Sequence, residues 1–395
     1  MSTTPLGLYI SVPFCRTKCS FCNFASGPAS NALFDSYIEH IERELAGAEG
    51  LARTLGGQFE RTVDSVYLGG GTPSILTPEQ LRRVFAAVRA NFDVLPGAEI
   101  TVECAPSTLS AAMVETLVAC GVNRVNLGVQ SFIDIESRSV GRMHTRDITL
   151  AEIGRLRDAG LTEISLDLIA GLPHQTAESW KRSLEDALAV GVPHISVYML
   201  EVDEDSRLGR ELIAGGTRYH AHHVPDDDLV VDLYVKACET FDRAGVHQYE
   251  ISNFARPDHE SRHNLKYWRR QPYLGFGVDA HSMLPAPRPG EPHAAVRAET
   301  ADDLDKLLSG APRTVTQVTE QAAVEETYFL GLRLSEGVDL LQVKLDFGIP
   351  AVDRYREPII EMANDGLVEV EEGRLRLTTR GRLFSNEVFA RFLKD

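Results

Sequence analysis

The chain has 395 residues, 43% of them hydrophobic and 25% charged, a composition typical of a globular protein with a large core. No apolar run reaches the length of a membrane span, and Met1 to Pro5 lacks signal-peptide architecture, so we expect a cytoplasmic protein without an integral membrane segment. The formal net charge of −17 argues against a nucleic-acid partner, which usually leaves a basic footprint. Because no secretory signal is present, the six cysteines are expected to be free thiols, for which metal or redox use is favoured over disulfides.

The first half of the chain alternates short apolar runs with longer helical patterns. The apolar runs, each expected to be a strand buried on both faces, cover residues 7–12, 63–71, 98–103, 122–130, 162–171 and 193–200. The helical patterns cover residues 33–55, 78–91, 110–120, 147–159 and 176–190. The residues placed to begin or end helices are Thr77, Pro78, Ser110 and Thr176 at the starts and Gly121, Gly160 and Gly191 at the ends. Successive β–α units predict a parallel α/β fold, and polar residues after consecutive strands favour a full or partial barrel over a doubly wound sheet.

The last part of the chain differs in character. After residue 284, the stretch PAPRPGEPHAA is rich in proline and predicts a surface loop or linker. Beyond it, helical patterns precede VEVEEGRLRL, which predicts a β-hairpin, and a further helix. We therefore expect a barrel domain over residues 1–312 and a small winged-helix-like domain over residues 313–395, with a docking or structural role.

Three cysteines, Cys15, Cys19 and Cys22, follow the first predicted strand with the spacing Cys-x3-Cys-x2-Cys. A structural zinc site would lack its fourth ligand, because the nearest downstream histidine is His40. Three ordinary packing thiols would make the tight spacing a coincidence. Three thiolates can also hold a [4Fe–4S] cluster and leave its fourth iron open for a ligand. The spacing and the position after a strand favour the cluster.

The cysteine spacing, followed by an aromatic residue, resembles the radical S-adenosylmethionine (SAM) family, in which SAM chelates the open iron through its amino and carboxylate groups. Further motifs resemble the coproporphyrinogen III oxidase-like branch of that family along nearly the whole chain. They are LYISVPFC, YLGGGTPSIL, LGVQSF, GRMH, LDLIAGLPHQT, YEISNFARP, RHNLKYW and YLGFGVDAHS. This resemblance implies a partial (β/α) barrel of the radical SAM type.

The resemblance also implies which residues contact SAM, while no residue is assigned as catalytic. The GGGT segment is expected to contact the SAM amine, and Arg142 is expected to neutralise its carboxylate. The implied SAM contacts are Tyr9, Gly70, Gly71, Thr72, Glu103, Gln130, Arg142 and Asp167. Two positions depart from the family pattern: Ser11 stands where histidine is usual, and Ala105 where asparagine is usual. We expect these replacements to change hydrogen bonding around the cluster and SAM.

One motif separates the possible functions within the branch. Anaerobic coproporphyrinogen oxidases carry another cysteine directly after the triplet and a longer N-terminal segment, whereas Asn23 and Phe24 follow Cys22 here and the first predicted strand begins by Leu6. The chain is therefore more similar to the HemW-like group of haem chaperones, which implies haem binding and delivery of haem to acceptor proteins. The alternatives are an oxygen-independent coproporphyrinogen III oxidase that decarboxylates propionates through a 5′-deoxyadenosyl radical, and a radical SAM enzyme acting on another substrate.

The stretch RHNLKYW supplies the candidate haem contacts. His263 is the predicted axial ligand, because imidazole commonly binds haem iron. The alternative is that His263 only caps a strand or hydrogen-bonds the backbone, in which case His281 in DAHS is the next candidate ligand. Tyr267 and Trp268 offer flat faces for a porphyrin. The basic residues expected to pair with the haem propionates are Arg262, Lys266, Arg269 and Arg270. The sequence leaves open the haem acceptor, the oligomeric state and the question of whether SAM is cleaved or only bound.

Overall fold

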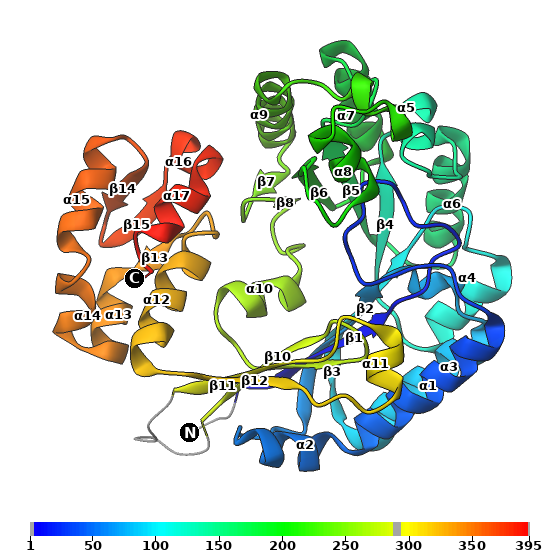
Figure 1. The fold of residues 1–395 in the computed structure, drawn as a ribbon, viewed down its shortest axis with the longest axis horizontal. Helices are drawn as coiled ribbons and strands as arrows, with labels where there is room; N and C mark the ends of the chain where they lie inside the picture. Colours follow the sequence, from blue (N-terminus) through cyan, green and yellow to red (C-terminus); the bar gives the residue numbers. More distant parts are fainter. Residues whose placement is uncertain (1–3, 287–293, 394–395) are drawn as a thin grey trace.

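The computed structural model describes residues 4–286 and 294–393, and its main feature is a large mixed sheet (Figure 1). In the described chain this sheet has 12 strands in the order β12-β11-β10-β9-β1-β2-β3-β4-β5-β6-β8-β7. Six neighbouring strands run parallel in chain order: β1 (Leu6–Val12), β2 (Thr62–Gly70), β3 (Asp93–Cys104), β4 (Arg124–Gln130), β5 (Glu163–Ala170) and β6 (His194–Met199). The linear order leaves the sheet open, which confirms the predicted partial barrel.

Helices follow the parallel strands, and all but α5 fall in segments where the sequence predicts a helix. They are α1 (Asn31–Ala46), α2 (Ala48–Leu55), α3 (Pro78–Asn91), α4 (Ala111–Ala119), α5 (Asp134–Ser139), α6 (Arg146–Asp158) and α7 (Ala177–Val190). Thr77 caps α3 by accepting the Gln80 N–H, and Gly191 ends α7 in the left-handed conformation. The helix expected over residues 33–55 is two helices, because Gly47 leaves the helical path at φ −88° and ψ 1°.

Short strands extend the sheet on both sides of the parallel part. On one side β9 (Tyr273–Phe276) runs parallel to β1 and is followed by antiparallel β10 (His281–Pro285), β11 (Ala295–Glu299) and β12 (Thr314–Val318). On the other side β8 (Asn253–Ala255) and β7 (His247–Gln248) lie antiparallel beyond β6. Of the proline-rich stretch, residues 287–293 lie outside the described chain, and its flanks pair as β10 and β11. Both flanks therefore belong to the same sheet.

The remaining elements of the barrel domain are short, apart from α9. They are η1 (Pro73–Ile75), α8 (Arg207–Ile213), η2 (Arg218–His223), α9 (Asp227–Arg243), α10 (Arg262–Trp268) and α11 (Leu304–Leu308). Each helix in the described part of the chain is too short or too polar to traverse a bilayer.

A small module with its own core follows β12. It contains α12 (Glu320–Gly331), β13 (Val338–Asp339), α13 (Leu340–Phe347), α14 (Ile349–Asp353), α15 (Arg356–Asn364), β14 (Val368–Glu371), β15 (Arg374–Leu377), α16 (Thr379–Leu383) and α17 (Ser385–Ala390). The predicted hairpin is β14 and β15, and β13 completes a three-stranded sheet. Tyr328, Leu375 and Phe392 are buried in its core. Because β12 pairs with β11, the expected boundary at 312/313 precedes a strand that belongs to the large sheet.

Helix α10 lies between the barrel and the C-terminal module (Figure 1), and a buried carboxylate holds its first turn. Glu99 on β3 accepts hydrogen bonds from the backbone N–H groups of Arg262 at 3.0 Å and His263 at 2.9 Å, and from the Ser261 hydroxyl at 3.4 Å. Arg124 on β4 lies 3.7 Å from the same carboxylate, and both side chains are only 6% exposed. The negative charge of Glu99 therefore lies at the N-terminus of α10, where the helix dipole favours it.

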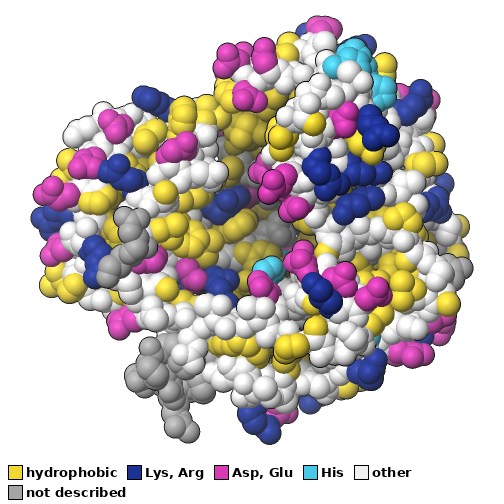
Figure 2. Space-filling model, in the orientation of Figure 1, with side chains coloured by type: hydrophobic (Ala, Val, Ile, Leu, Met, Phe, Trp, Pro, Cys, Tyr) yellow, Lys and Arg dark blue, Asp and Glu magenta, His cyan; other side chains and the backbone are white. Residues whose placement is uncertain are grey.

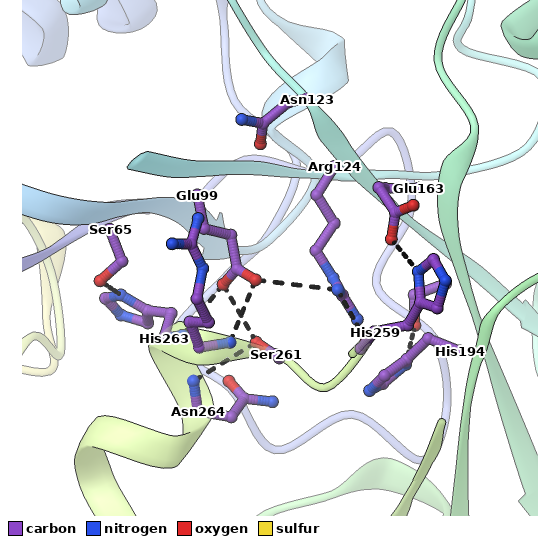
Figure 3. Close-up of polar contacts among 12 residues, drawn as sticks. Ser65, Glu99, Asn123, Arg124, Glu163, His194, His259, Ser261, His263 and Asn264 are labelled. Carbon is purple, nitrogen blue, oxygen red and sulfur yellow. Dashed lines mark hydrogen bonds and ion pairs between the residues drawn. The ribbon is translucent and has the colours of Figure 1, made fainter. Parts of the chain in front are cut away.

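Further polar contacts surround Arg124 inside the barrel, as Figure 3 shows. Arg124 donates to the backbone oxygen of His259 at 3.0 Å, and the His259 ring lies 2.7 Å from Glu163 on β5. His194 on β6 pairs with Ser165 at 2.6 Å. We call these side chains the basal polar network, because Arg124, Glu163 and His194 stand at the amino ends of β4, β5 and β6. The members of the network are Glu99, Arg124, Glu163, His194, His259, Ser261 and His263.

We predict that Glu99→Ala lowers the free energy of unfolding by about 3–5 kcal/mol, because it leaves Arg124 as a buried charge without its partner. Glu49→Ala is the matched control. Its ion pair with Arg53 is exposed on α2, so its removal should cost at most about 0.5 kcal/mol. Denaturant unfolding followed by circular dichroism measures both values. Equal losses in the two variants would show that the basal polar network does not anchor the fold.

Candidate functional site

The cysteine loop follows β1 and opens onto a pocket of about 370 Å³, which we call the cysteine pocket. The sulfurs of Cys15 and Cys22 lie 3.8 and 4.0 Å from the Ser26 hydroxyl, so both face the same small region, and Cys19 lines the same pocket. Phe14 anchors the loop by stacking on Phe34, with ring centroids 4.2 Å apart. The structure therefore brings the three predicted ligands to one cavity.

Two residues from loops elsewhere in the chain, Thr72 after β2 and Arg142 after α5, contact the cysteine sulfurs. The Thr72 hydroxyl donates to Cys15 Sγ, and Arg142 Nη1 donates to Cys19 Sγ, each at 3.6 Å. Such donors favour the thiolate form that binds iron and tune the potential of a cluster. Burial raises the pKa of the Cys22 thiol, so that ligand gains from positive charge nearby. This donor set suits an iron–sulfur cluster with three thiolate ligands.

Two buried carboxyl groups face the cysteine pocket from β3 and β5. The Tyr67 hydroxyl donates to Glu103 at 2.8 Å, and Asn126 Nδ2 donates to Asp167 at 2.9 Å. Burial, with a smaller contribution from the charge of Asp167, raises the pKa of Glu103 to about 7. Burial likewise raises the pKa of Asp167 to about 6. A cationic ligand would offset this cost of burying two negative charges close together.

Several buried polar atoms around the carboxylates have no partner among the described residues. They are Asp167 Oδ1, Asn126 Oδ1 and Arg142 Nε. Buried polar atoms are normally paired, so these atoms indicate a ligand with donors for the two oxygens and an acceptor for the guanidinium. SAM offers both kinds of group, together with positive charge. The residues present therefore fit SAM.

Glycines let the backbone approach this pocket closely. A Cβ on Gly71 would lie 2.7 Å from the backbone oxygens of Val12 and Phe14, and a Cβ on Gly128 would lie 2.8 Å from Arg142 Nη2. The N–H of Gly71 donates to Val12 at 3.0 Å. The GGGT segment therefore fixes the cysteine loop as well as lining the pocket.

The structure places nearly all predicted cluster and SAM residues in this one pocket. Those lining it are Cys15, Cys19, Cys22, Gly70, Gly71, Thr72, Glu103, Gln130, Arg142 and Asp167. Ala105, one of the two departures from the family pattern, lines it too. Tyr9, expected to contact SAM, instead lines a neighbouring pocket together with Ser11. The individual roles remain predictions.

Tyr67, Asn126 and Tyr198 are among the residues lining the cysteine pocket that sequence reasoning missed. A signal for Asn126 was present in the alternation of β4, since successive strand residues point to opposite faces. Asn126, Gly128 and Gln130 follow that alternation and all line the pocket. Tyr67 lacked such a signal, because nothing in its own strand shows that its hydroxyl meets Glu103.

A second pocket, of about 520 Å³, adjoins the first and shares Phe24 and Gly70 with it. We call it the aromatic pocket; its described lining includes Tyr9, Phe24, Tyr267, Trp268, Tyr273, Asp279, His281, Arg297 and, from α12, Leu330. Figure 2 shows the molecule hollowed between the C-terminal module and the barrel. The two pockets therefore lie side by side.

The structure contradicts the predicted role of His263 as an axial ligand. Its ring is buried, with Nδ1 2.9 Å from the Ser65 hydroxyl and Nε2 2.8 Å from the Tyr267 hydroxyl. Burial lowers its pKa to about 3. Because both ring nitrogens already have partners, neither is available to iron, and His263 instead joins α10 to the barrel.

The basic residues of the same motif have partners elsewhere and none lines the aromatic pocket, so their role at the propionates stays a prediction. Arg262 donates to the Gly97 oxygen at 2.7 Å, and Lys266 pairs with Asp64 at 2.7 Å. Arg269 and Arg270 pair with the C-terminal module, through Glu336 at 2.9 Å and Glu326 at 2.8 Å. Tyr267 and Trp268, by contrast, do line the aromatic pocket as expected.

An open parallel barrel with three cysteines after its first strand and a carboxylate-lined pocket at the ends of its strands defines a radical SAM protein. Residues 9–187 match the Radical SAM superfamily, and residues 318–384 match the HemN C-terminal domain. The chain belongs to the HemW family within that superfamily. Its cofactors are accordingly a [4Fe–4S] cluster and SAM.

Relatives and a solved structure support this placement over the full length. The chain is 32% identical to the "Heme chaperone HemW" of Lactococcus lactis, covering 100% of this chain and 99% of that protein. It is 33% identical to the protein of the same name from Bacillus subtilis, covering 98% and 99%. The structure of coproporphyrinogen III oxidase (HemN) from Escherichia coli aligns with a TM-score of 0.82 and 24% identity, covering 99% of this chain and 90% of that one. This last similarity establishes the fold.

For the cluster, we predict that anaerobically reconstituted protein holds about four irons per chain and that Cys19→Ala removes them, because it takes away one of the three thiolates that would hold the cube. Cys238→Ala is the control, since Cys238 lies on α9 and lines neither pocket. Iron and sulfide analysis with absorbance spectra measures the outcome. Full iron content in the Cys19→Ala protein would contradict the assignment.

For SAM, we predict that affinity falls by about tenfold between pH 8 and pH 6, since the cation binds best when Glu103 is ionised and must displace its proton below pH 7. Glu103→Gln should bind more weakly at pH 8 and show a flatter pH dependence. The amine of SAM titrates with both proteins, so comparing the two slopes isolates Glu103. Anaerobic calorimetry gives the affinities, and parallel slopes would exclude this role.

Proposed function

We propose that the protein is a haem chaperone that holds a [4Fe–4S] cluster, SAM and haem and delivers the haem to acceptor proteins. The observation that carries the proposal is the aromatic pocket beside the cysteine pocket, with walls supplied by Tyr267 and Trp268 of the α10 motif. Aromatic faces suit a flat porphyrin. The relatives named as haem chaperones support it over the whole chain. We place it in the cytoplasm, where its six cysteines stay reduced.

The second candidate function is the oxidation of coproporphyrinogen III, and its support is the shared fold alone. We favour the chaperone because Asn23 and Phe24 follow Cys22, and Phe24, which lines both pockets, stands where the spacing Cys-x2-Cys-x-Cys would put a further cysteine. That further cysteine is a feature of the oxidases, which this chain resembles less. When bound, the cluster and SAM supply one-electron chemistry; the chain's own groups bind and orient them through Arg142, Glu103 and Asp167.

We predict that the anaerobically reconstituted protein binds haem with a stoichiometry near one per chain and yields no protoporphyrinogen from coproporphyrinogen III. Trp268→Ala should weaken haem binding by about tenfold, because it removes a desolvated aromatic wall. Tyr219→Ala, a change at an aromatic residue that lines neither pocket, is the control. Hemin titration followed at the Soret band gives the affinity, and transfer to apomyoglobin tests delivery.

Three results would count against the chaperone. Wild-type protein that develops no Soret band would remove haem binding. Haem that is bound but never passes to apomyoglobin would remove delivery to this acceptor. Steady formation of protoporphyrinogen would replace the proposal with the oxidase.

A further inference from the structure

The aromatic pocket contains a histidine that is available to iron, unlike His263. His281 at the start of β10 lines the pocket, and its side chain is 58% exposed. Its Nε2 lies 3.9 Å from Asp279 Oδ1, and its Nδ1 lies 3.8 Å from Glu299 Oε2. Both separations exceed hydrogen-bond length, so neither ring nitrogen is held by a short contact. His281 is the one histidine among the described residues that line this pocket.

Other potential iron ligands in the pocket are less suitable. Tyrosine binds haem iron as the phenolate, and three tyrosines, Tyr9, Tyr267 and Tyr273, line the pocket. Burial raises the pKa of each of these phenols, which disfavours the phenolate. No cysteine or methionine is among the described lining residues. The lining therefore points to His281.

The surroundings of His281 match those of a metal-binding histidine. Such a histidine usually donates its second ring N–H to a carboxylate, which fixes the ring and raises its basicity. Glu299 is the direct cross-strand neighbour of His281 in the β10–β11 ladder, so its carboxylate can accept from Nδ1 after a small rotation. Nε2 is then the nitrogen left for iron. The ligand is carried by a strand, which holds it more firmly than a loop would.

Trp268 and Arg297 offer donors for the propionates. Trp268 Nε1 is buried without a partner among the described residues, an arrangement that indicates an absent acceptor. Arg297 lines the same pocket and places Nη1 3.2 Å from the Tyr273 hydroxyl. Its guanidinium has further N–H groups beyond that contact and the one to Glu326 at 2.8 Å. Asp279 and Glu299, beside His281, repel carboxylates from their own side of the pocket.

We propose that haem binds in the aromatic pocket with His281 Nε2 as an axial ligand to its iron and its propionates directed to Trp268 and Arg297. This inference rests on the proposed haem-binding function and adds the ligand and the orientation. Coordination by a neutral imidazole requires no oxidant or reductant.

The test compares the full-length wild-type protein with four variants, each reconstituted with its iron–sulfur cluster and titrated anaerobically with hemin. His281→Ala should lose at least tenfold in affinity or shift its Soret band, with iron content and SAM affinity unchanged. Added imidazole should restore a wild-type-like spectrum by filling the vacated space. His281→Met should bind haem with a different spectrum, since methionine is also an axial ligand. His247→Ala, which removes another histidine that is 58% exposed and beside a carboxylate, is the matched control and should resemble wild type.

His263→Gln separates ligation from support of the fold. It should keep the wild-type Soret position wherever its iron–sulfur content is intact. Two results would overturn the assignment while leaving haem binding established. One is a histidine-type spectrum in His281→Ala; the other is imidazole rescue of His263→Gln but not of His281→Ala. A wild-type protein that binds no hemin would instead overturn the proposed function itself.

Discussion

The buried carboxylate of Glu99 positions the parts of the structure that form both pockets. It accepts from two backbone N–H groups at the start of α10 and lies beside Arg124, so its desolvation is offset by donors and by an opposite charge. The anchored helix turns His263 inward, where its ring stacks on Tyr67 with centroids 5.3 Å apart. Tyr67 in turn donates to Glu103 in the cysteine pocket. The buried charge of Glu99 is thus linked, through α10, His263 and Tyr67, to Glu103 in the cysteine pocket.

The two pockets are built on opposite electrostatic principles. In the cysteine pocket, burial raises the pKa values of Glu103 and Asp167 to about 7 and about 6, so the ligand-free fold loses stability as pH rises from the ordinary carboxyl range up to these values. A bound cationic ligand has the opposite effect, because it stabilises the ionised forms of both carboxyl groups. The aromatic pocket instead combines apolar faces with Arg297 and an unpaired indole N–H, which suits a flat molecule with carboxylates. The two neighbouring pockets therefore differ in the charge of the ligand that each would favour.

The sequence was sufficient for what depends on local pattern. Apolar runs, N-caps such as Thr77 and terminal glycines such as Gly191 predicted the β–α units, and the cysteine spacing predicted the cluster site. It could not predict the role of His263, because Ser65, which holds its Nδ1, is 198 residues away in the chain. The RHNLKYW motif indicated a haem-binding region, yet only the fold shows that its histidine points into the barrel while Trp268 lines a pocket. Which histidine meets a ligand is a tertiary property.

The same helix also explains why the C-terminal module belongs to the site. Glu326 on α12 binds both Arg270, at the end of α10, and Arg297, in the aromatic pocket, each at 2.8 Å. Its carboxylate is only 11% exposed, so these pairs are less screened than surface ion pairs. Arg333, just after α12, lies 4.3 Å above the Trp268 ring. Since the module contacts two pocket-lining residues, Arg297 and Trp268, it cannot shift against α10 without moving that wall of the aromatic pocket. A change in how the module docks would therefore also change the shape of the aromatic pocket.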